Sequence, residues 1–239
     1  MKATKFFAVI VVTALMSANS YGQTVDEIVD KHVAALGGLD KINAVNNIVT
    51  ERSMAVGGME IPNKTIVVVG KALRNESTVM GNKMVEVVEG TSGWMIRPTM
   101  MGGTGEPETM PADQIKQRIS QLDPFGALVN YKAKGAKIEL VGKEKLDKKD
   151  VYHLKVTNKE GVVIQEYLDA NTYLVSKVKF DINGQEGEIG LYDYKDVDGI
   201  KFANTMDISN DQMGVMSFIT SKITLNSKLD DSVFKKPVK

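Results

Sequence analysis

The spacing of hydrophobic and polar positions changes along this chain and divides it into three kinds of segment. Residues 25–36 place Val25, Ile28, Val33 and Leu36 on one stripe at helical spacing. Most of the later chain alternates between apolar and polar positions, with turn signals about every 8 to 12 residues. Residues 93–131 break this rhythm. The pattern predicts an N-terminal helix and an antiparallel meander with one central insertion.

The predicted N-terminal helix has clear start and stop signals. Thr24 and Glu27 stand at the positions of a capping box, and Gly37-Gly38 ends the helical pattern. His32 lies on or beside the apolar stripe, where we expect a packed or half-exposed histidine rather than a metal ligand.

Alternation and turn signals predict strands on both sides of the insertion. Before it we expect five, and after it seven. The earlier strands are Ile48–Val56, Met59–Gly70, Leu73–Met80, Met84–Val88 and Ser92–Ile96, and the later ones Lys137–Val141, Val151–Val156, Val162–Leu168, Thr172–Phe180, Glu186–Tyr194, Ile200–Ile208 and Val215–Leu225. Asn183-Gly184 and Asp198-Gly199 predict type I′ hairpin turns. In the charged tail, Val233 and Phe234 are expected to dock on the domain.

The central insertion contains the only tryptophan, then a loop rich in methionine and glycine, then a helical pattern. Pro111 suits the first turn of a helix, which we expect to run from about Pro111 to Leu128, with Pro124 ending or bending it. Two interpretations stay open. The segment covers an ordinary core, or it is a lid over an apolar cavity.

The lid interpretation assigns eight residues to a ligand-binding surface. It places Ile115, Ile119, Leu122 and Phe125 on the concave side of the sheet and Trp94, Met95, Met100 and Met101 near the rim. The Met/Gly loop from Thr99 to Gly105 would act as a hinge. If Ile119 packs in a solid core, Ile119→Arg should unfold the protein; if it lines a cavity, the variant should fold but lose ligand.

Composition narrows the function classes. The chain has 239 residues, 30 basic and 30 acidic side chains, 13 methionines and no cysteine. Disulfides, thiol catalysis and thiolate metal sites are therefore excluded, and the balanced charge gives no reason to expect a nucleic-acid partner. Methionine is common on adaptable apolar binding surfaces.

The first 22 residues have the pattern of a secretory signal peptide. Lys2 and Lys5 precede an apolar run that is too short to span a bilayer. Small residues follow, so we expect cleavage before Gln23, with a competing site before Tyr21. The alternative is an uncleaved anchor.

Residues 23–239 show no linker and no strong repeat, and we expect them to form one domain, exported across the inner membrane to the periplasm.

No catalytic or cofactor-binding motif stands out. His32 and His153 have no partners at metal-ligand spacing, and the sequence contains no Gly-x-Ser-x-Gly elbow and no phosphate-binding loop. Asp193, Asp196 and Asp198 are most simply the solvated end of a hairpin. We therefore expect no enzyme activity, no cofactor and no metal site.

With these elements laid out, the sequence resembles the LolA/LolB-like group, specifically the outer membrane lipoprotein-sorting proteins. The resemblance covers nearly all of residues 23–239, and the order of short motifs carries it more than any single one. They are residues 25–28, 35–38, 93–96, 110–114, 141–144, 167–169, 172–174, 194–199 and 231–234. One departure is Ala203, where relatives often have proline, and no residue is matched to the lipid-gating arginine of the carriers.

The resemblance implies a mainly β (α+β) fold: one strongly curved antiparallel sheet, an unclosed half-barrel, with helices covering its concave face. It also implies binding of lipid or of lipoprotein acyl chains in the periplasm, as a carrier does. We expect a monomer that meets membrane-bound donor or acceptor proteins. The alternative is a non-carrier use of the fold, such as an envelope-stress sensor or a scaffold that binds a protein partner. An undetected hydrolase is a third reading.

Overall fold

The computed structural model describes residues 23–56, 58–182, 184–210 and 214–237, so the expected signal segment lies outside the described residues. The helices are α1 (Val25–Leu36), α2 (Leu39–Asn43) and α3 (Ala112–Ile119), with 3-10 turns η1 (Thr99–Met101), η2 (Ser120–Leu122) and η3 (Asp231–Phe234). The strands are β1 (Asn47–Val56), β2 (Met59–Val68), β3 (Ala72–Val79), β4 (Asn82–Glu89), β5 (Ser92–Ile96), β6 (Pro107–Thr109), β7 (Lys137–Leu146), β8 (Lys149–Thr157), β9 (Val163–Asp169), β10 (Val175–Ile182), β11 (Gln185–Val197), β12 (Ile200–Asn210) and β13 (Gly214–Leu225).

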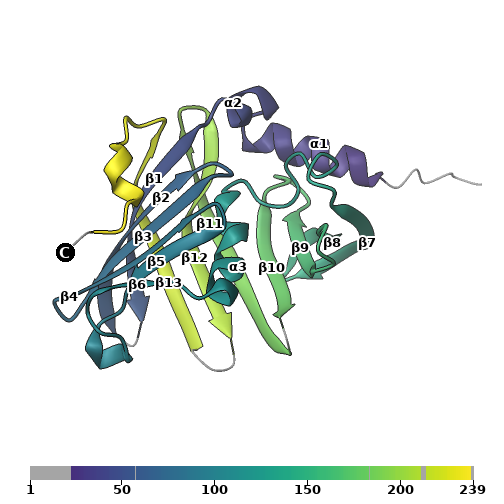
Figure 1. The fold of residues 1–239 in the computed structure, drawn as a ribbon. Helices are drawn as coiled ribbons and strands as arrows, with labels where there is room; N and C mark the ends of the chain where they lie inside the picture. The colour runs from purple at the N-terminus through teal and green to yellow at the C-terminus, as the bar shows by residue number, and fades with distance from the viewer. Residues whose placement is uncertain (1–22, 57, 183, 211–213, 238–239) are drawn as a thin grey trace, which may run out of the picture.

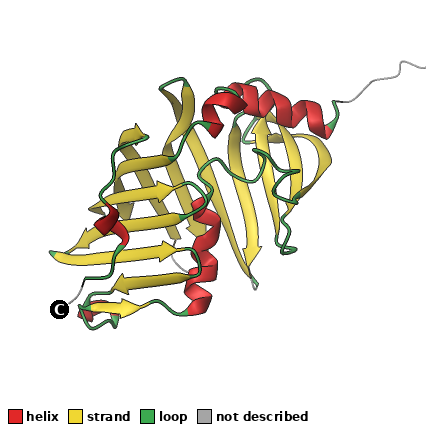
Figure 2. Cartoon of the chain, turned by 45° about the horizontal axis from the view of Figure 1, so that its top comes forward, coloured by secondary structure: helices red, strands yellow, loops and turns green. Residues whose placement is uncertain are grey.

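All these strands join one antiparallel sheet. Its order is β6-β5-β4-β3-β2-β1-β13-β12-β11-β10-β9-β8-β7, so β6 and β7 are free edges and the sheet does not close into a barrel. Each half of the chain forms a meander, and the pairing of β1 with β13 joins the halves. The expected fold class, a mainly β protein with an unclosed antiparallel sheet, is confirmed (Figures 1 and 2).

Helix α1 begins and ends where the sequence predicts. The Thr24 hydroxyl accepts from the Glu27 amide at 3.2 Å, and the Thr24 amide donates to the Glu27 carboxylate at 2.9 Å, which completes the capping box. The buried face of α1 packs on Leu128, Leu154 and Leu168. At its end Gly37 has φ 130°, and a Cβ there would lie 2.1 Å from the Gly199 carbonyl oxygen, so a side chain has no room.

The two faces of the sheet carry different covering elements. Ile115 of α3 contacts Val88 and Met95, and Leu122 of η2 contacts Val67 and Leu73. We call this the inner face; α1 covers the same face at the β7–β10 end of the sheet (Figures 1 and 2). The opposite, outer face carries η3, whose Phe234 packs against the buried side chains of Val85, Val87 and Trp94.

The structure corrects the expected bounds of the central helix and of some strands, such as Val175–Ile182 where we expected Thr172–Phe180. The central helix ends at Ile119, with one 3-10 turn to Leu122, rather than continuing to Leu128. Pro124 explains this, because its ring disfavours the helical conformation at Asp123, which has φ −108° and ψ 89°. Helix α2 and the short strand β6 were not predicted.

Several other expectations are confirmed. Seven strands follow the insertion, and the tail docks through Phe234. Asp198 and Gly199 both have positive φ, as a type I′ turn requires. The turn predicted at Asn183-Gly184 includes position 183, which lies outside the described residues.

Candidate functional site

Four of the eight residues predicted for a ligand surface lie on the inner face. Met95 and Ile115 contact each other in a small buried cluster, and Leu122 is buried in another. Phe125 is half-buried, with its ring centroid 6.0 Å from that of Phe202. The structure therefore brings these side chains against the sheet, where they form packed contacts.

The other four lie elsewhere. Trp94 is on the outer face, where its indole Nε1 donates to the Phe234 carbonyl at 2.8 Å. Neighbouring residues of a strand point to opposite faces, so Trp94 and Met95 cannot both face the same surface. Met100, Met101 and Ile119 are exposed, Ile119 by 44%. The outer-face contacts of Trp94 and the exposure of the other three residues therefore give no support for placing them on the inner face.

The inner face carries an apolar surface that runs from the part covered by α3 to the part covered by α1, where its members Val178 and Leu191 pack against the α1 cluster. Two cross-strand rows form it, which we call the inner strip. One row contains Ile61, Met54, Phe218, Met206 and Leu191, and the other Met216, Ile208, Ile189 and Val178. All but Ile61 are half-buried. The longer row crosses five strands and spans about 19 Å, the length scale of a long acyl chain.

A polar row borders the inner strip. Thr220, Arg52, Asn63 and Ser77 are cross-strand neighbours on β13, β1, β2 and β3. Asn63 donates to Asn75 Oδ1 at 2.7 Å. Arg52 Nε and Ser77 Oγ are buried and have no hydrogen-bond partner. The row therefore places unsatisfied polar atoms beside an apolar surface.

Two carboxylates on the inner face have different environments. Glu86 of β4 accepts from Arg118 of α3 at 3.0 and 2.8 Å, a bidentate pair. Glu166 of β9 continues the shorter row of the inner strip, pairing with Val178 and Leu154 across the sheet. Burial raises the pKa of Glu166 to about 7, so this carboxyl group changes charge near neutral pH.

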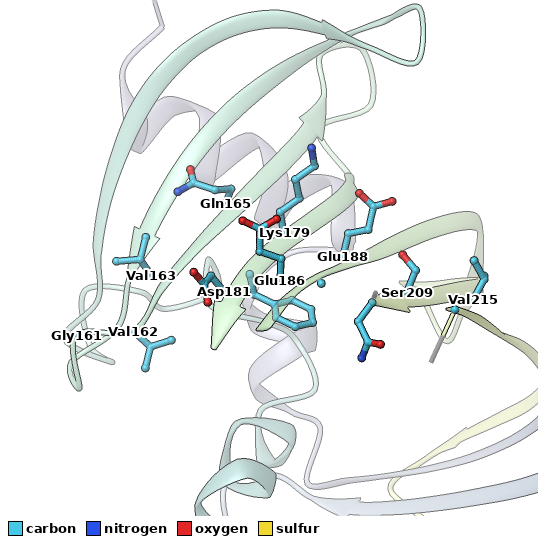
Figure 3. A pocket seen from close by; sticks show the side chains of 14 residues that line it. Gly161, Val162, Val163, Gln165, Lys179, Asp181, Glu186, Glu188, Ser209 and Val215 are labelled. Carbon is cyan, nitrogen blue, oxygen red and sulfur yellow. The ribbon is translucent and has the colours of Figure 1, made fainter. Parts of the chain in front are cut away.

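Two open grooves lie outside the inner strip. The larger, of about 940 Å³, lies at the ends of β9–β13 and is lined by Gln165, Lys179, Asp181 and Glu188 among others (Figure 3). Its lining residues adjoin positions 183 and 211–213, which lie outside the described residues. The smaller, of about 460 Å³, is lined by Arg52, Asn63 and Ser77 of the polar row together with Glu51, Lys64, Glu76 and Lys83. The larger groove also has apolar lining residues, among them Val162, Val163 and Val215, and charged side chains share its surface with them.

Both histidines are held by contacts with other groups of the protein. His32 is buried, with Nδ1 2.8 Å from the Tyr173 carbonyl oxygen, and burial lowers its pKa. His153 lies 2.8 Å from Gln165 Oε1 and stacks on Tyr167. Within the described ranges, no three His, Cys, Asp or Glu side chains are grouped as metal ligands would be. The helices of this part of the chain are too short or too polar to cross a bilayer.

Sequence reasoning missed Arg52 and Glu166. The signal was available in the alternation, because Arg52 is two residues from Met54 and Glu166 lies between Ile164 and Leu168 on strands with an apolar face. A charged residue at a strand position whose neighbours on the same face are apolar indicates a binding or strained position more strongly than a loop of exposed methionines does.

No protein-family model matches the sequence, and no curated protein matches it either. Several solved structures do match the fold of this chain. A DUF1329 family protein from Desulfovibrio piger aligns over 90% of this chain and 98% of its own, with a TM-score of 0.59 and 16% identity. A LolA superfamily protein from Nitrosomonas europaea covers 90% and 99%, with a TM-score of 0.58 and 13% identity.

A third structure is that of a putative outer membrane lipoprotein-sorting protein domain from Vibrio parahaemolyticus, which covers 88% of this chain and 95% of its own, with a TM-score of 0.55 and 18% identity. Identities this low relate the backbones and leave the site to be argued from this chain's own residues. With its open curved sheet and its helices on the inner face, the chain has a LolA-like fold.

Proposed function

We propose that this protein binds lipid or the acyl chains of lipoproteins on the inner strip, and carries them through the periplasm in the manner of an outer membrane lipoprotein-sorting protein. The observation that carries the proposal is the inner strip itself, a row-by-row apolar surface that is half-buried on the helix-bearing face of the sheet. The LolA-like fold and the signal-peptide pattern of residues 1–22 support it.

Burial of apolar surface along a strip of this length favours chain-shaped ligands over compact ones. Each methylene removed from water contributes about 0.8 kcal/mol, so a long acyl chain on this surface gains roughly 10 kcal/mol before entropic losses. Release of such a ligand requires the surface to change. In this proposal the segment 111–128, which already places Ile115, Leu122 and Phe125 on the inner face, moves as a lid, with the exposed Met100 and Met101 in its hinge loop.

The test uses two neighbouring positions on β13. Phe218 belongs to the inner strip, whereas Ile219 points to the outer face and is 51% exposed. Binding of the neutral fluorescent probe N-phenyl-1-naphthylamine is measured, and lipid is extracted from purified protein and identified by mass spectrometry. Phe218→Ser should weaken probe binding about tenfold or more, which corresponds to about 1.4 kcal/mol, and Ile219→Ser should leave it unchanged.

The same pair of variants addresses the alternative, a scaffold that binds a protein partner. Tyr192 and Ile219 are exposed apolar side chains on the outer face of β11 and β13, the two strands that flank β12, and each is paired with Thr205 of β12. A protein that retains no lipid, binds no probe and is unaffected by Phe218→Ser would contradict the carrier proposal and favour this alternative.

A further inference from the structure

Arg52 is the most unusual charged residue on the inner face. Its Nε atom is buried without a hydrogen-bond partner, and within the described part of the chain no ion pair or hydrogen bond satisfies its guanidinium group. Arginine keeps its charge under all ordinary conditions. Arg52 as a whole is half-buried, but its Nε is shielded from water without a partner, and a charge that is partly buried without compensation is costly.

The neighbouring carboxylates do not supply that partner. Glu86 lies on the same face but is engaged by both nitrogens of the Arg118 fork at 3.0 and 2.8 Å. Glu51 precedes Arg52 in the strand and therefore points to the outer face. Burial also lowers the pKa of Arg52, the direction expected for a cation that lacks a counter-charge.

A second unsatisfied group lies in the same polar row. Ser77 is only 5% exposed, and its Oγ is buried without a partner. Arg52 and Ser77 both pair with Asn63, one from each side, so their Cα atoms are about 10 Å apart across two strand spacings. Guanidinium and hydroxyl groups are both donors, and together they suit an anion with several oxygen atoms.

The apolar surroundings define the rest of the ligand. Arg52 is two residues from Met54 on β1, and Met54 pairs with Phe218 in the longer row of the inner strip. An anion held at Arg52 therefore lies at the border of a surface that accepts a hydrocarbon chain. A small inorganic anion would leave that surface uncovered.

We propose that Arg52, assisted by Ser77, binds the anionic head group of an amphiphile, a carboxylate or a phosphate, whose hydrocarbon chain lies on the inner strip. This inference rests on the proposed function and names the chemical class of its ligand. It predicts a preference for anionic over neutral chains of equal length.

The experiment compares three competitors for N-phenyl-1-naphthylamine on the wild-type protein: myristate, tetradecyl phosphate and tetradecanol. Charge-assisted hydrogen bonds are worth enough for about a tenfold difference in affinity, so at least one anionic chain should bind about tenfold more tightly than the alcohol. The stronger of the two anions distinguishes a carboxylate head group from a phosphate. In Arg52→Gln the preference should disappear while alcohol binding stays unchanged.

Two controls separate head-group binding from a structural role. Arg74→Gln removes an arginine on the outer face that already has a carboxylate partner, Glu76, and it should keep the wild-type preference. Ligand-free Arg52→Gln should melt at or above the wild-type temperature, because it removes a half-buried charge that has no partner. A purely structural arginine would instead make that variant less stable.

The outcomes are distinguishable. Equal affinity of the wild type for anions and alcohol, or an unchanged preference in Arg52→Gln, overturns the inference and leaves the proposed function standing. A wild type that binds neither probe nor alcohol nor anions overturns both.

Discussion

At the residue scale, Arg52 and Glu166 show how this fold treats charge on its inner face. Both lie on strands whose neighbouring inner positions are apolar, and neither is in an ion pair within the described residues. Arginine cannot neutralise itself, whereas a carboxyl group can take up a proton. The two residues therefore respond to burial differently: Arg52 stays charged, and Glu166 titrates.

Glu166 gives stability a pH dependence of known sign. Its pKa rises from 4.5 to about 7 on folding, mainly through burial, so the folded state holds the proton more tightly than the unfolded state. Its contribution is most favourable below about pH 4.5, falls as pH rises to about 7, and is then constant. The loss across that window is at most about 3 kcal/mol.

We predict that Glu166→Gln stabilises the protein at pH 8 relative to wild type and does so much less at pH 5, because only the ionised carboxylate opposes folding. Melting temperature at both pH values measures this. Glu139→Gln, at an exposed carboxylate of β7, is the matched control and should show no such difference. An equal shift at both pH values would contradict burial as the cause.

At the element scale, α3 and η2 attach to the sheet through few side chains. Ile115 and Leu122 are buried at 6% and 7% exposure, while Ile119, one helical turn after Ile115, is 44% exposed. Arg118 adds the bidentate contact to Glu86. Two buried apolar side chains, one ion pair and a hydrogen bond from the Gly70 amide to the Leu122 carbonyl at 2.9 Å therefore hold α3 and η2 on the sheet, few enough contacts for the movement required of a lid.

We predict that Ile115→Arg lowers the free energy of unfolding by about 3 kcal/mol or more, because it buries a charge beside Val88 and Met95. Ile119→Arg should change it by less than about 0.5 kcal/mol, since that position is exposed. Urea unfolding of both variants measures the contrast. The sequence alone suggested Ile119→Arg as a test between a solid core and a cavity. Because Ile119 is exposed, this variant cannot make that distinction. Comparable losses in both variants would show that Ile119 is buried in solution.

At the scale of the whole molecule, one hydrogen-bonded sheet connects two separate sets of covering elements. Helix α1 packs at the β7–β10 end, and α3, η2 and η3 pack at the β2–β5 end. The strands β1 and β11–β13 lie between them and carry most of the inner strip. A ligand on the inner strip would therefore contact the region where the two halves meet.

We predict a single cooperative unfolding transition, because the pairing of β1 with β13 makes the sheet continuous. Trp94 is the only tryptophan and reports on β5 and η3, whereas far-ultraviolet circular dichroism reports on all strands. The two denaturation curves should coincide. An earlier transition in Trp94 fluorescence would show that the β2–β5 end unfolds by itself, contrary to a single domain.

The sequence by itself determined the elements that local rules govern. The capping box at Thr24 and Glu27 and the glycine pair after Leu36 set the bounds of α1. Asp198-Gly199 set a hairpin turn, and alternation set the seven strands after the insertion. These features depend on residues close together in the chain, so their spacing carries the information.

Only the tertiary structure decided which face each strand presents and what covers it. Trp94 and Met95 are adjacent and both apolar, and the sequence does not say that η3, about 140 residues later, docks on one while α3 docks on the other. In the same way, the inner strip is assembled from β1, β2 and β10–β13, whose order follows from the pairing of β1 with β13. Strand pairing over long sequence separations brings Arg52, Ser77 and Phe218 to one face, because a sheet makes neighbours of residues that share a register position and not a place in the chain.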